Sequence, residues 1–232
     1  MVSPFSFNQG VKNTRLIFVR HGQIESNVLG KFSIRDEEPL NSEGIEQIKK
    51  TSMRIRDQFE PDVMFCSPVF RAKMSAQIIG DGWLEPVEMP DLAEYDFGEV
   101  SGLTLAEIRE QFPDSYKAYV EYVNAEDQTK LKRPIIPGGE TLDDVAVRVS
   151  RFTDYVLETC PGKVVLAVSH GAFIKIALQV YTGRVFNRSI PFWIDNGSIT
   201  VVDFYKRTPI IRLVNDFHHI SDEIPPSRPA VI

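Results

Sequence analysis

The sequence predicts an α/β fold, a three-layer sandwich in which a mainly parallel sheet carries helices on both faces and is extended by an inserted cap region. Two patterns lead to this prediction. Short apolar runs, typical of buried strands, alternate with segments in which apolar residues recur every three or four positions, as along one face of a helix. Three of the apolar runs also stop at a polar cluster, and ligands of parallel sheets gather beyond the carboxyl ends of the strands.

The three predicted core strands are Leu16–Val19, Val63–Cys66 and Val164–Val168. Each is apolar throughout, as expected of a strand that is covered on both faces. The polar clusters that follow them are Arg20-His21-Gly22, Ser67-Pro68 and Ser169-His170-Gly171. Because parallel strands end at the same edge of a sheet, we expect these three clusters to share one crevice.

Two long helices are predicted from apolar periodicity. The first, capped by Ser42, has the face Ile45, Ile48, Ser52, Ile55 and Phe59. The second has the face Leu142, Val145, Val149, Phe152 and Val156. It begins with a capping-box pattern, in which Asp144 reaches back to the amide of Thr141, and it ends before Pro161-Gly162.

The remaining chain adds two strands and an insert. Ser198–Phe204 and Ile210–Val214 are predicted to form an antiparallel pair at one edge of the sheet. Residues 112–137 interrupt the alternation with prolines, tyrosines and a basic group, which indicates an inserted substrate cap. Within it, residues 115–123 are predicted to be helical, whereas prolines and a Pro137-Gly138-Gly139 turn exclude a helix from the second half.

Size and composition indicate one ordinary folded domain. With 232 residues, of which 43% are hydrophobic and 25% charged, we expect a single domain over residues 1–223 and a loose tail at 224–232. The net charge of −6 disfavours partnership with nucleic acid or an anionic membrane. The purest apolar run, 164–168, is too short to span a bilayer, and residues 1–10 lack a secretion pattern, so a cytoplasmic protein is expected.

Cysteines and histidines show no metal-binding spacing. Cys66 and Cys160 are far apart and neither belongs to a CxxC pair, which predicts isolated buried thiols. The four histidines contain no HxxxH or HxH pattern, and the adjacent His218 and His219 cannot both chelate one ion from a strand. We therefore predict neither a metal nor a cofactor, and a structural role for the segment 215–219.

Arginine and histidine side chains dominate the predicted strand ends. Arg20 offers a planar fork of donors that matches two oxygens of a phosphoryl group, and a neutral His21 offers a nitrogen nucleophile. Gly22 would let the backbone approach a ligand, with its amide donating to an oxygen. Arg71 falls in the first turn of the next helix, where amides attract anions, and His170 adds a third cation or donor. Together these residues predict a phosphoryl-transfer site.

In these motifs and their order the sequence resembles the histidine phosphatase superfamily, also called the phosphoglycerate mutase-like fold, from about Arg15 to His219. Asn27 resembles the amide of the family's phosphate pocket. The motifs that match are Arg20-His21-Gly22, Ser67-Pro68-Val69-Phe70-Arg71-Ala72, Leu92-Ala93-Glu94-Tyr95-Asp96-Phe97-Gly98, Pro137-Gly138-Gly139-Glu140-Thr141 and Ser169-His170-Gly171. Each motif is weak alone, but jointly they are highly specific.

The resemblance implies a metal-independent phosphoric monoester hydrolase of the histidine acid phosphatase type, in which His21 attacks phosphorus and becomes a phosphohistidine. The phosphoryl oxygens would be held by Arg20, Asn27, Arg71 and His170. A neutral His21 needs a fixed acceptor for its other ring nitrogen, and a backbone carbonyl is the expected partner. Glu94 is implied as the acid that protonates the leaving alkoxide and then deprotonates water. The residues alone leave this assignment open among the nearby acids Glu85, Glu88, Asp91, Asp96 and Glu99.

Three functions remain open. They are hydrolysis of a small phosphorylated metabolite, a phosphoglycerate mutase reaction, and non-catalytic binding of a phosphorylated ligand. Tyr95, Asp96 and Phe97 follow the acid where the mutase pattern has basic residues, which favours the phosphatase. Retention of every reacting residue disfavours a mere binding module. The substrate stays undetermined among sugar phosphates, phosphoglycerates, nucleotide monophosphates, cofactor precursors and phosphotyrosine, and a homodimer is possible.

Selectivity is predicted to lie in the insert and in the residues after Glu94, because loops on a rigid scaffold carry specificity. The candidate substrate contacts are Gly22, Asn27, Tyr95, Lys132, Arg133 and Gly171. Three tyrosines of the insert, Tyr116, Tyr119 and Tyr122, have helical spacing and are predicted to be packing residues rather than a substrate wall.

Overall fold

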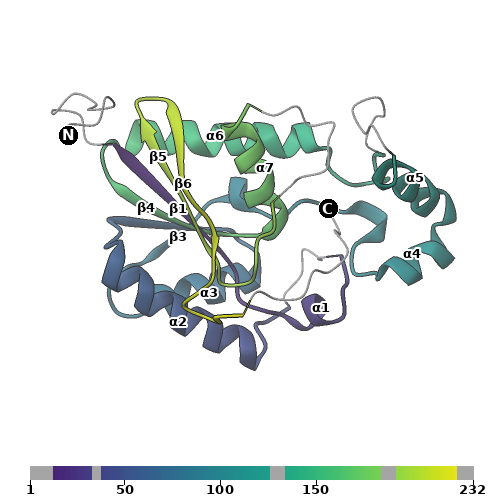
Figure 1. The fold of residues 1–232 in the computed structure, drawn as a ribbon, viewed down its shortest axis with the longest axis horizontal. Helices are drawn as coiled ribbons and strands as arrows, with labels where there is room; N and C mark the ends of the chain where they lie inside the picture. The colour runs from purple at the N-terminus through teal and green to yellow at the C-terminus, as the bar shows by residue number, and fades with distance from the viewer. Residues whose placement is uncertain (1–12, 33–37, 126–133, 184–191, 224–232) are drawn as a thin grey trace.

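The computed structural model describes residues 13–32, 38–125, 134–183 and 192–223 (Figure 1). Within them one sheet has the strand order β3-β2-β4-β1-β5-β6. The strands are β1 Thr14–Arg20, β2 Val63–Cys66, β3 Pro86–Glu88, β4 Val164–Ser169, β5 Ile199–Tyr205 and β6 Thr208–Asp216. The first four pair in parallel, whereas β5 and β6 are antiparallel additions on one side. The mainly parallel sheet and its antiparallel edge pair are thus confirmed.

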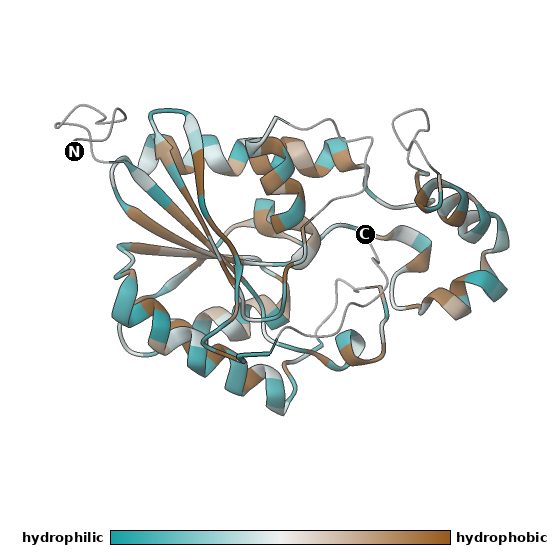
Figure 2. Ribbon diagram, in the orientation of Figure 1, coloured by the Kyte–Doolittle hydropathy of each residue, from teal (hydrophilic) through white to brown (hydrophobic). Residues whose placement is uncertain are grey.

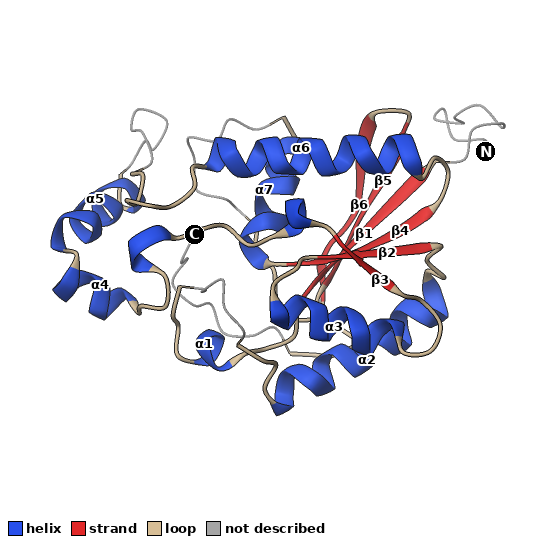
Figure 3. Cartoon of the chain, turned by 180° about the vertical axis from the view of Figure 1, so that it is seen from behind, coloured by secondary structure: helices blue, strands red, loops and turns tan. Residues whose placement is uncertain are grey.

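Helices cover both faces of the sheet, with α6 and α7 on one side and α2 and α3 on the other (Figures 1 and 3). The helices are α1 Glu25–Val28, α2 Ser42–Gln58, α3 Phe70–Gly80, α4 Leu105–Gln111, α5 Pro113–Val123, α6 Leu142–Thr159 and α7 Gly171–Tyr181, with short 3-10 turns at Pro90–Leu92 and Gly98–Val100. The α4–α5 pair lies away from the sheet, to the right in Figure 1. The predicted three-layer sandwich with helices on both faces is confirmed.

Strand β1 shows why the core strands are apolar along their whole length. Leu16 and Phe18 belong to the apolar cluster formed with α6 and α7. Ile17 and Val19 point the other way, into the cluster formed with α2 and α3. All four residues are almost completely buried, and brown, hydrophobic stretches run along the strands of the sheet in Figure 2. Both faces of the sheet are therefore core, which removes the polar alternation of a half-exposed strand.

The two long helices begin close to where the sequence placed them, with one correction. Ser42 is the first residue of α2, and the N-cap is Asn41, whose side-chain oxygen accepts the Gly44 amide at 2.8 Å. Asparagine and serine cap helices equally well, so residue type did not separate these neighbours. At α6 the capping box of Thr141 and Asp144 is present as predicted.

The insert is helical in its first half, as predicted. The expected helix over residues 115–123 lies within α5, where Pro113 occupies the first turn and its fixed φ suits a helix start. Residues 134–137, at the end of the insert, form no helix. Residues 126–133 and the predicted tail at 224–232 lie outside the described residues. The elements α1, β3 and α4 were not predicted, because four, three and seven residues are too few for a clear periodicity. The helix α7 was not predicted either, because it is buried on nearly every side and shows no polar face.

Cys66 and Cys160 are both buried and free, as expected. In the portion of the chain that the structure describes, every helix is too short or too polar to cross a membrane.

Removal of an aromatic ring from the core should test the packing of α6 on the sheet. Phe152 is fully buried, with its ring centroid 6.5 Å from that of Phe18 and 5.9 Å from that of Phe65. We expect Phe152→Ala to lower the free energy of unfolding by about 3–5 kcal/mol, measured by urea denaturation. Val147→Ala, on the same helix but 60% exposed, should change it by less than about 0.5 kcal/mol. Equal effects of the two substitutions would contradict the assigned packing.

Candidate active site

The carboxyl ends of β1, β2 and β4 bring the predicted motifs together. In the parallel pairing, Arg20 lies opposite Ser169 and Cys66 lies opposite Val168. The ladder continues one residue past the strands: the His21 amide donates to the Ser169 carbonyl at 3.0 Å, and the Ser67 amide donates to the Val168 carbonyl at 2.9 Å. Residues separated by as many as about 150 positions in the sequence therefore become neighbours.

Two imidazoles and a guanidinium lie in contact at this edge. The ring centroids of His21 and His170 are 5.1 Å apart, in an edge-to-face arrangement. Arg71 enters from the first turn of α3, and its Nε donates to Nε2 of His21 at 3.2 Å. All three side chains are completely buried. The structure thus brings His21, Arg71 and His170 into one cluster.

The tautomer of His21 follows from its partners. Nδ1 lies 2.7 Å from the Gly22 carbonyl, which can only accept, so Nδ1 carries the proton. Nε2 then presents a lone pair on the side of Arg71. Burial, followed by the charges of Arg71 and Arg20, holds the pKa of His21 well below its ordinary value. The ring is therefore neutral and has its nucleophilic nitrogen oriented, and the expected backbone acceptor is the carbonyl of Gly22.

His170 is held by Ser67, the residue that follows β2. Its Nε2 lies 2.7 Å from Oγ of Ser67, and its buried Nδ1 has no hydrogen-bond partner among the described residues. Burial, and then the charges of Arg71 and Arg20, lower the pKa of His170 well below the ordinary value. Of the two roles predicted for His170, cation or donor, these surroundings favour the neutral donor.

Arg20 and Asn27 are fixed by a turn that the sequence did not connect to the site. Arg20 donates through Nη1 to the Ile194 carbonyl at 2.6 Å. Asn196 donates through Nδ2 both to the His21 carbonyl and to Oδ1 of Asn27, each at 3.0 Å. The Asn196-Gly197 pair before β5 is a turn signal in the sequence, but nothing in it indicates that the turn contacts β1.

The two glycines of the motifs have different surroundings. A Cβ on Gly171 would lie 3.3 Å from Nε of Arg20, so this position leaves room for the guanidinium. Gly22 has a structural reason that the sequence did not indicate, since a Cβ would lie 2.4 Å from the Gly44 carbonyl oxygen of α2, and its amide donates to Oγ of Ser75 at 3.2 Å. The approach of this backbone to a ligand stays a prediction.

Glu94 reaches the site from the loop after β3. It is only 5% exposed, whereas the competing acids of the same segment are exposed or half-buried. Its Oε1 accepts the Tyr95 amide at 2.9 Å and the Phe173 amide at 3.3 Å. Phe173 lies in the first turn of α7, three residues after the N-cap His170. The carboxyl group of Glu94 and the imidazole of His170 therefore share one helix N-terminus.

Tyr95 lies in the wall of a cavity beside α5. Its hydroxyl donates to the Glu140 carbonyl, and its ring packs 4.9 Å from that of Phe97. The cavity measures about 220 Å³ and is lined mainly by apolar groups of Tyr95, α5 and residues 134–137. Lys132 and Arg133, predicted as substrate contacts, lie outside the described residues.

The tyrosines of the insert divide between packing and lining. Tyr122 is buried and Tyr116 packs against the main core, as predicted, whereas Tyr119 lines the cavity beside α5. Among the residues that the structure describes, no three His, Cys, Asp or Glu side chains converge as metal ligands. His219 instead contacts Oγ1 of Thr51 at 3.0 Å and the Gly197 carbonyl at 3.2 Å, a structural contact of the predicted kind.

Comparison with known proteins agrees with this geometry. The family model of the histidine phosphatase superfamily (branch 1) matches residues 16–217. The chain belongs to the histidine phosphatase superfamily. This histidine phosphatase is 32% identical over 171 residues to the uncharacterized phosphatase PhoE of Bacillus subtilis, covering 73% of this chain and 78% of that one.

Other relatives of this histidine phosphatase act on phosphoserine by name. It is 29% identical over 210 residues to the metal-independent phosphoserine phosphatase of Arabidopsis thaliana, covering 90% and 84% of the two chains. The crystal structure of a phosphoserine phosphatase of Entamoeba histolytica in complex with 3-phosphoglyceric acid superposes with a TM-score of 0.76 at 25% identity, covering 89% and 99%. The protein is a phosphatase of this superfamily, a phosphoric monoester hydrolase.

The lowered pKa of His21 predicts a pH dependence of stability. Below about pH 6.5 the unfolded chain protonates this residue while the folded protein does not, so folding loses stability as the pH falls. We expect the free energy of unfolding of the wild type to fall more steeply than that of His21→Asn, by about 1.4 kcal/mol per pH unit. Urea denaturation between pH 7 and pH 5 checks this, and parallel profiles of the two proteins would contradict a buried, neutral imidazole. His219→Asn should change the slope with the same sign, because burial lowers the pKa of His219 to about 4.

Proposed function

We propose that this protein is a metal-independent phosphomonoesterase that hydrolyses a small phosphorylated metabolite through a phosphohistidine on His21. One observation carries the proposal. The Nδ1 proton of His21 is directed to the Gly22 carbonyl while Nε2 faces the buried guanidinium of Arg71. A neutral imidazole with its lone pair beside a cation is suited to attack a phosphate dianion that the same cation binds.

In the first step, Nε2 of His21 attacks phosphorus and the ester P–O bond breaks. The equatorial oxygens would be held by the donors gathered at the sheet edge, namely Arg20, Asn27, Arg71 and His170. Glu94 gives its proton to the departing alkoxide, which is a poor leaving group without it. The positive charge that develops on the imidazole is stabilised by the Gly22 carbonyl on Nδ1.

In the second step, the carboxylate of Glu94 takes a proton from water. The resulting hydroxide attacks phosphorus, the P–N bond breaks, and inorganic phosphate leaves. His21 returns to the neutral form and Glu94 to the protonated form, so the cycle balances without a metal or another cofactor. Each protein group thus ends the cycle in its starting protonation state.

Phosphoserine is the first substrate to examine, since relatives from Arabidopsis thaliana, Hydrogenobacter thermophilus and Entamoeba histolytica carry that activity in their names. The surroundings of Glu94 support hydrolysis over a mutase reaction. Asp96 follows it closely, with a carboxylate oxygen that accepts the Gly98 amide at 2.9 Å. An acidic side chain there disfavours a phosphoglycerate, whose carboxylate it would repel and which a mutase must hold while it returns the phosphoryl group, whereas phosphoserine also carries an ammonium group that Asp96 would attract.

Turnover of p-nitrophenyl phosphate in the presence of EDTA tests the proposal. We expect His21→Ala to lower kcat by more than about a thousandfold, because the nucleophile is lost. Ser150→Ala, an exposed substitution on α6, should leave kcat unchanged. Rapid quenching of the wild type with radiolabelled substrate should trap a phosphoryl group that is labile in acid and stable in alkali. Unchanged turnover by His21→Ala would overturn the proposal, as would isomerisation of 3-phosphoglycerate that outpaces phosphate release.

A further inference from the structure

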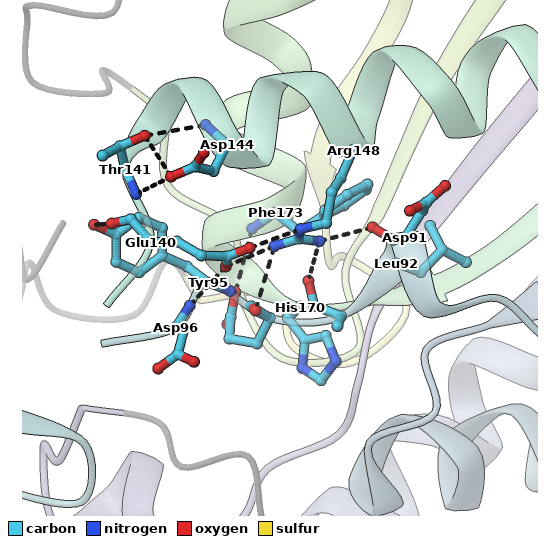
Figure 4. Close-up of polar contacts among 12 residues, drawn as sticks. Asp91, Leu92, Tyr95, Asp96, Glu140, Thr141, Asp144, Arg148, His170 and Phe173 are labelled. Atoms are coloured by element: carbon cyan, nitrogen blue, oxygen red, sulfur yellow. Dashed lines mark hydrogen bonds and ion pairs between the residues drawn. The ribbon is translucent and has the colours of Figure 1, made fainter. Parts of the chain in front are cut away.

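The loop that carries Glu94 is held by a single arginine of α6. Residues 93–97 have no regular secondary structure, so side chains must satisfy their backbone groups. Arg148 donates through Nη1 to the carbonyls of Asp91 at 2.8 Å and Ala93 at 2.9 Å, and through Nη2 to the carbonyl of Glu94 at 3.5 Å. Figure 4 shows these contacts converging on one guanidinium.

The rest of that guanidinium is bound by one carboxylate. Nε and Nη2 of Arg148 donate to the two oxygens of Glu140, each at 2.9 Å, in the bidentate arrangement that suits a planar fork (Figure 4). Arginine has five N–H donors, and these five contacts use all of them. The side chains are only 12% and 20% exposed, so water cannot easily replace either partner. In this arrangement every N–H donor of the Arg148 side chain has an acceptor.

Glu140 holds the chain on the other side of the acid. Its Oε2 accepts the Asp96 amide at 2.9 Å, and its own amide donates to the Asp96 carbonyl at 2.9 Å. Its carbonyl accepts the hydroxyl of Tyr95. The Arg148–Glu140 pair therefore binds the backbone on both sides of Glu94, at Ala93 before it and at Asp96 after it.

The same pair contacts the helix that orients the carboxyl group. The guanidinium of Arg148 lies over the ring of Phe173, 5.8 Å from its centroid. The amide of Phe173 is the one that donates to Oε1 of Glu94. Thus the loop, the carboxyl group and the start of α7 are joined through one ion pair.

We propose that Arg148, paired with Glu140, is a positioning residue that fixes Glu94 for proton transfer to the leaving group. The inference rests on the proposed function, in which Glu94 is the acid. Proton transfer requires donor and acceptor within about 2.6–3.2 Å, and a displacement of about 1 Å costs roughly a hundredfold in rate. Lysine at position 148 would keep the charge but lacks the planar fork, so it cannot hold the carbonyls and the carboxylate together.

Two substrates with different leaving groups separate positioning from a general structural role. β-Glycerophosphate releases an alkoxide that needs a proton, whereas p-nitrophenyl phosphate releases a phenolate that hardly needs one. The quantity to measure is kcat/KM, because it reports only the steps up to formation of the phosphoenzyme. The leaving group departs in that step. We expect Arg148→Lys to lower kcat/KM for β-glycerophosphate by about ten- to a hundredfold and for p-nitrophenyl phosphate by less than about threefold. Glu140→Gln should show the same selectivity.

Glu94→Gln and Arg151→Met are the reference variants. Arg151 lies on the same helix and pairs with the carboxylate of Asp91, but it is exposed and binds no carbonyl of the loop, so both substrates should be unaffected. Glu94→Gln should give the selective loss in full. One outcome would overturn the positioning role alone. In it, Glu94→Gln loses kcat/KM selectively for β-glycerophosphate, whereas Arg148→Lys and Glu140→Gln lose it equally for both esters or not at all. An equal loss on both esters in Glu94→Gln would instead overturn the acid role and the inference with it.

Discussion

The parallel register of β4 with its two neighbours is the constraint on which the site depends. Arg20 lies opposite Ser169 on one side of β4, and Cys66 lies opposite Val168 on the other. A shift of one residue in either pairing would turn the following side chains to the opposite face of the sheet. The apolar residues of β1 resist that shift, because Phe18 fits among aromatic rings on the α6 side and the smaller Val19 fits among aliphatic side chains on the α2 side.

Burial then gives this edge of the sheet its chemistry. Two imidazoles and the guanidinium of Arg71 are completely enclosed, and the positive charge of arginine disfavours a further positive charge beside it. Both histidines are neutral for that reason. A buried cation has lost its hydration, which makes the site receptive to a phosphate dianion that supplies opposite charge and acceptor oxygens. The electrostatic conditions for holding phosphate and for keeping the nucleophile unprotonated therefore have the same origin.

The acid and the nucleophile are supported independently. His21 is positioned by the end of β1 and by the turn that contains Asn196. Glu94 is positioned by the Arg148–Glu140 pair and by the first turn of α7. The sheet fixes His21 through backbone pairing, whereas Glu94 lies in an irregular loop and depends on side-chain hydrogen bonds. This difference explains why a polar framework surrounds the acid and an apolar one surrounds the core strands.

The sequence by itself determined the core strands, the two long helices, the sheet class and the cluster of arginines and histidines, because apolar periodicity and the residues that interrupt it are local properties. Tertiary structure alone decided three other features. Asn196 reaches Asn27 because β5 pairs with β1, Gly22 is required by the approach of α2, and Glu94 is distinguished from its neighbouring acids by burial. Each of these depends on contacts between segments far apart in the chain, and no local pattern of residue types encodes which segments will meet.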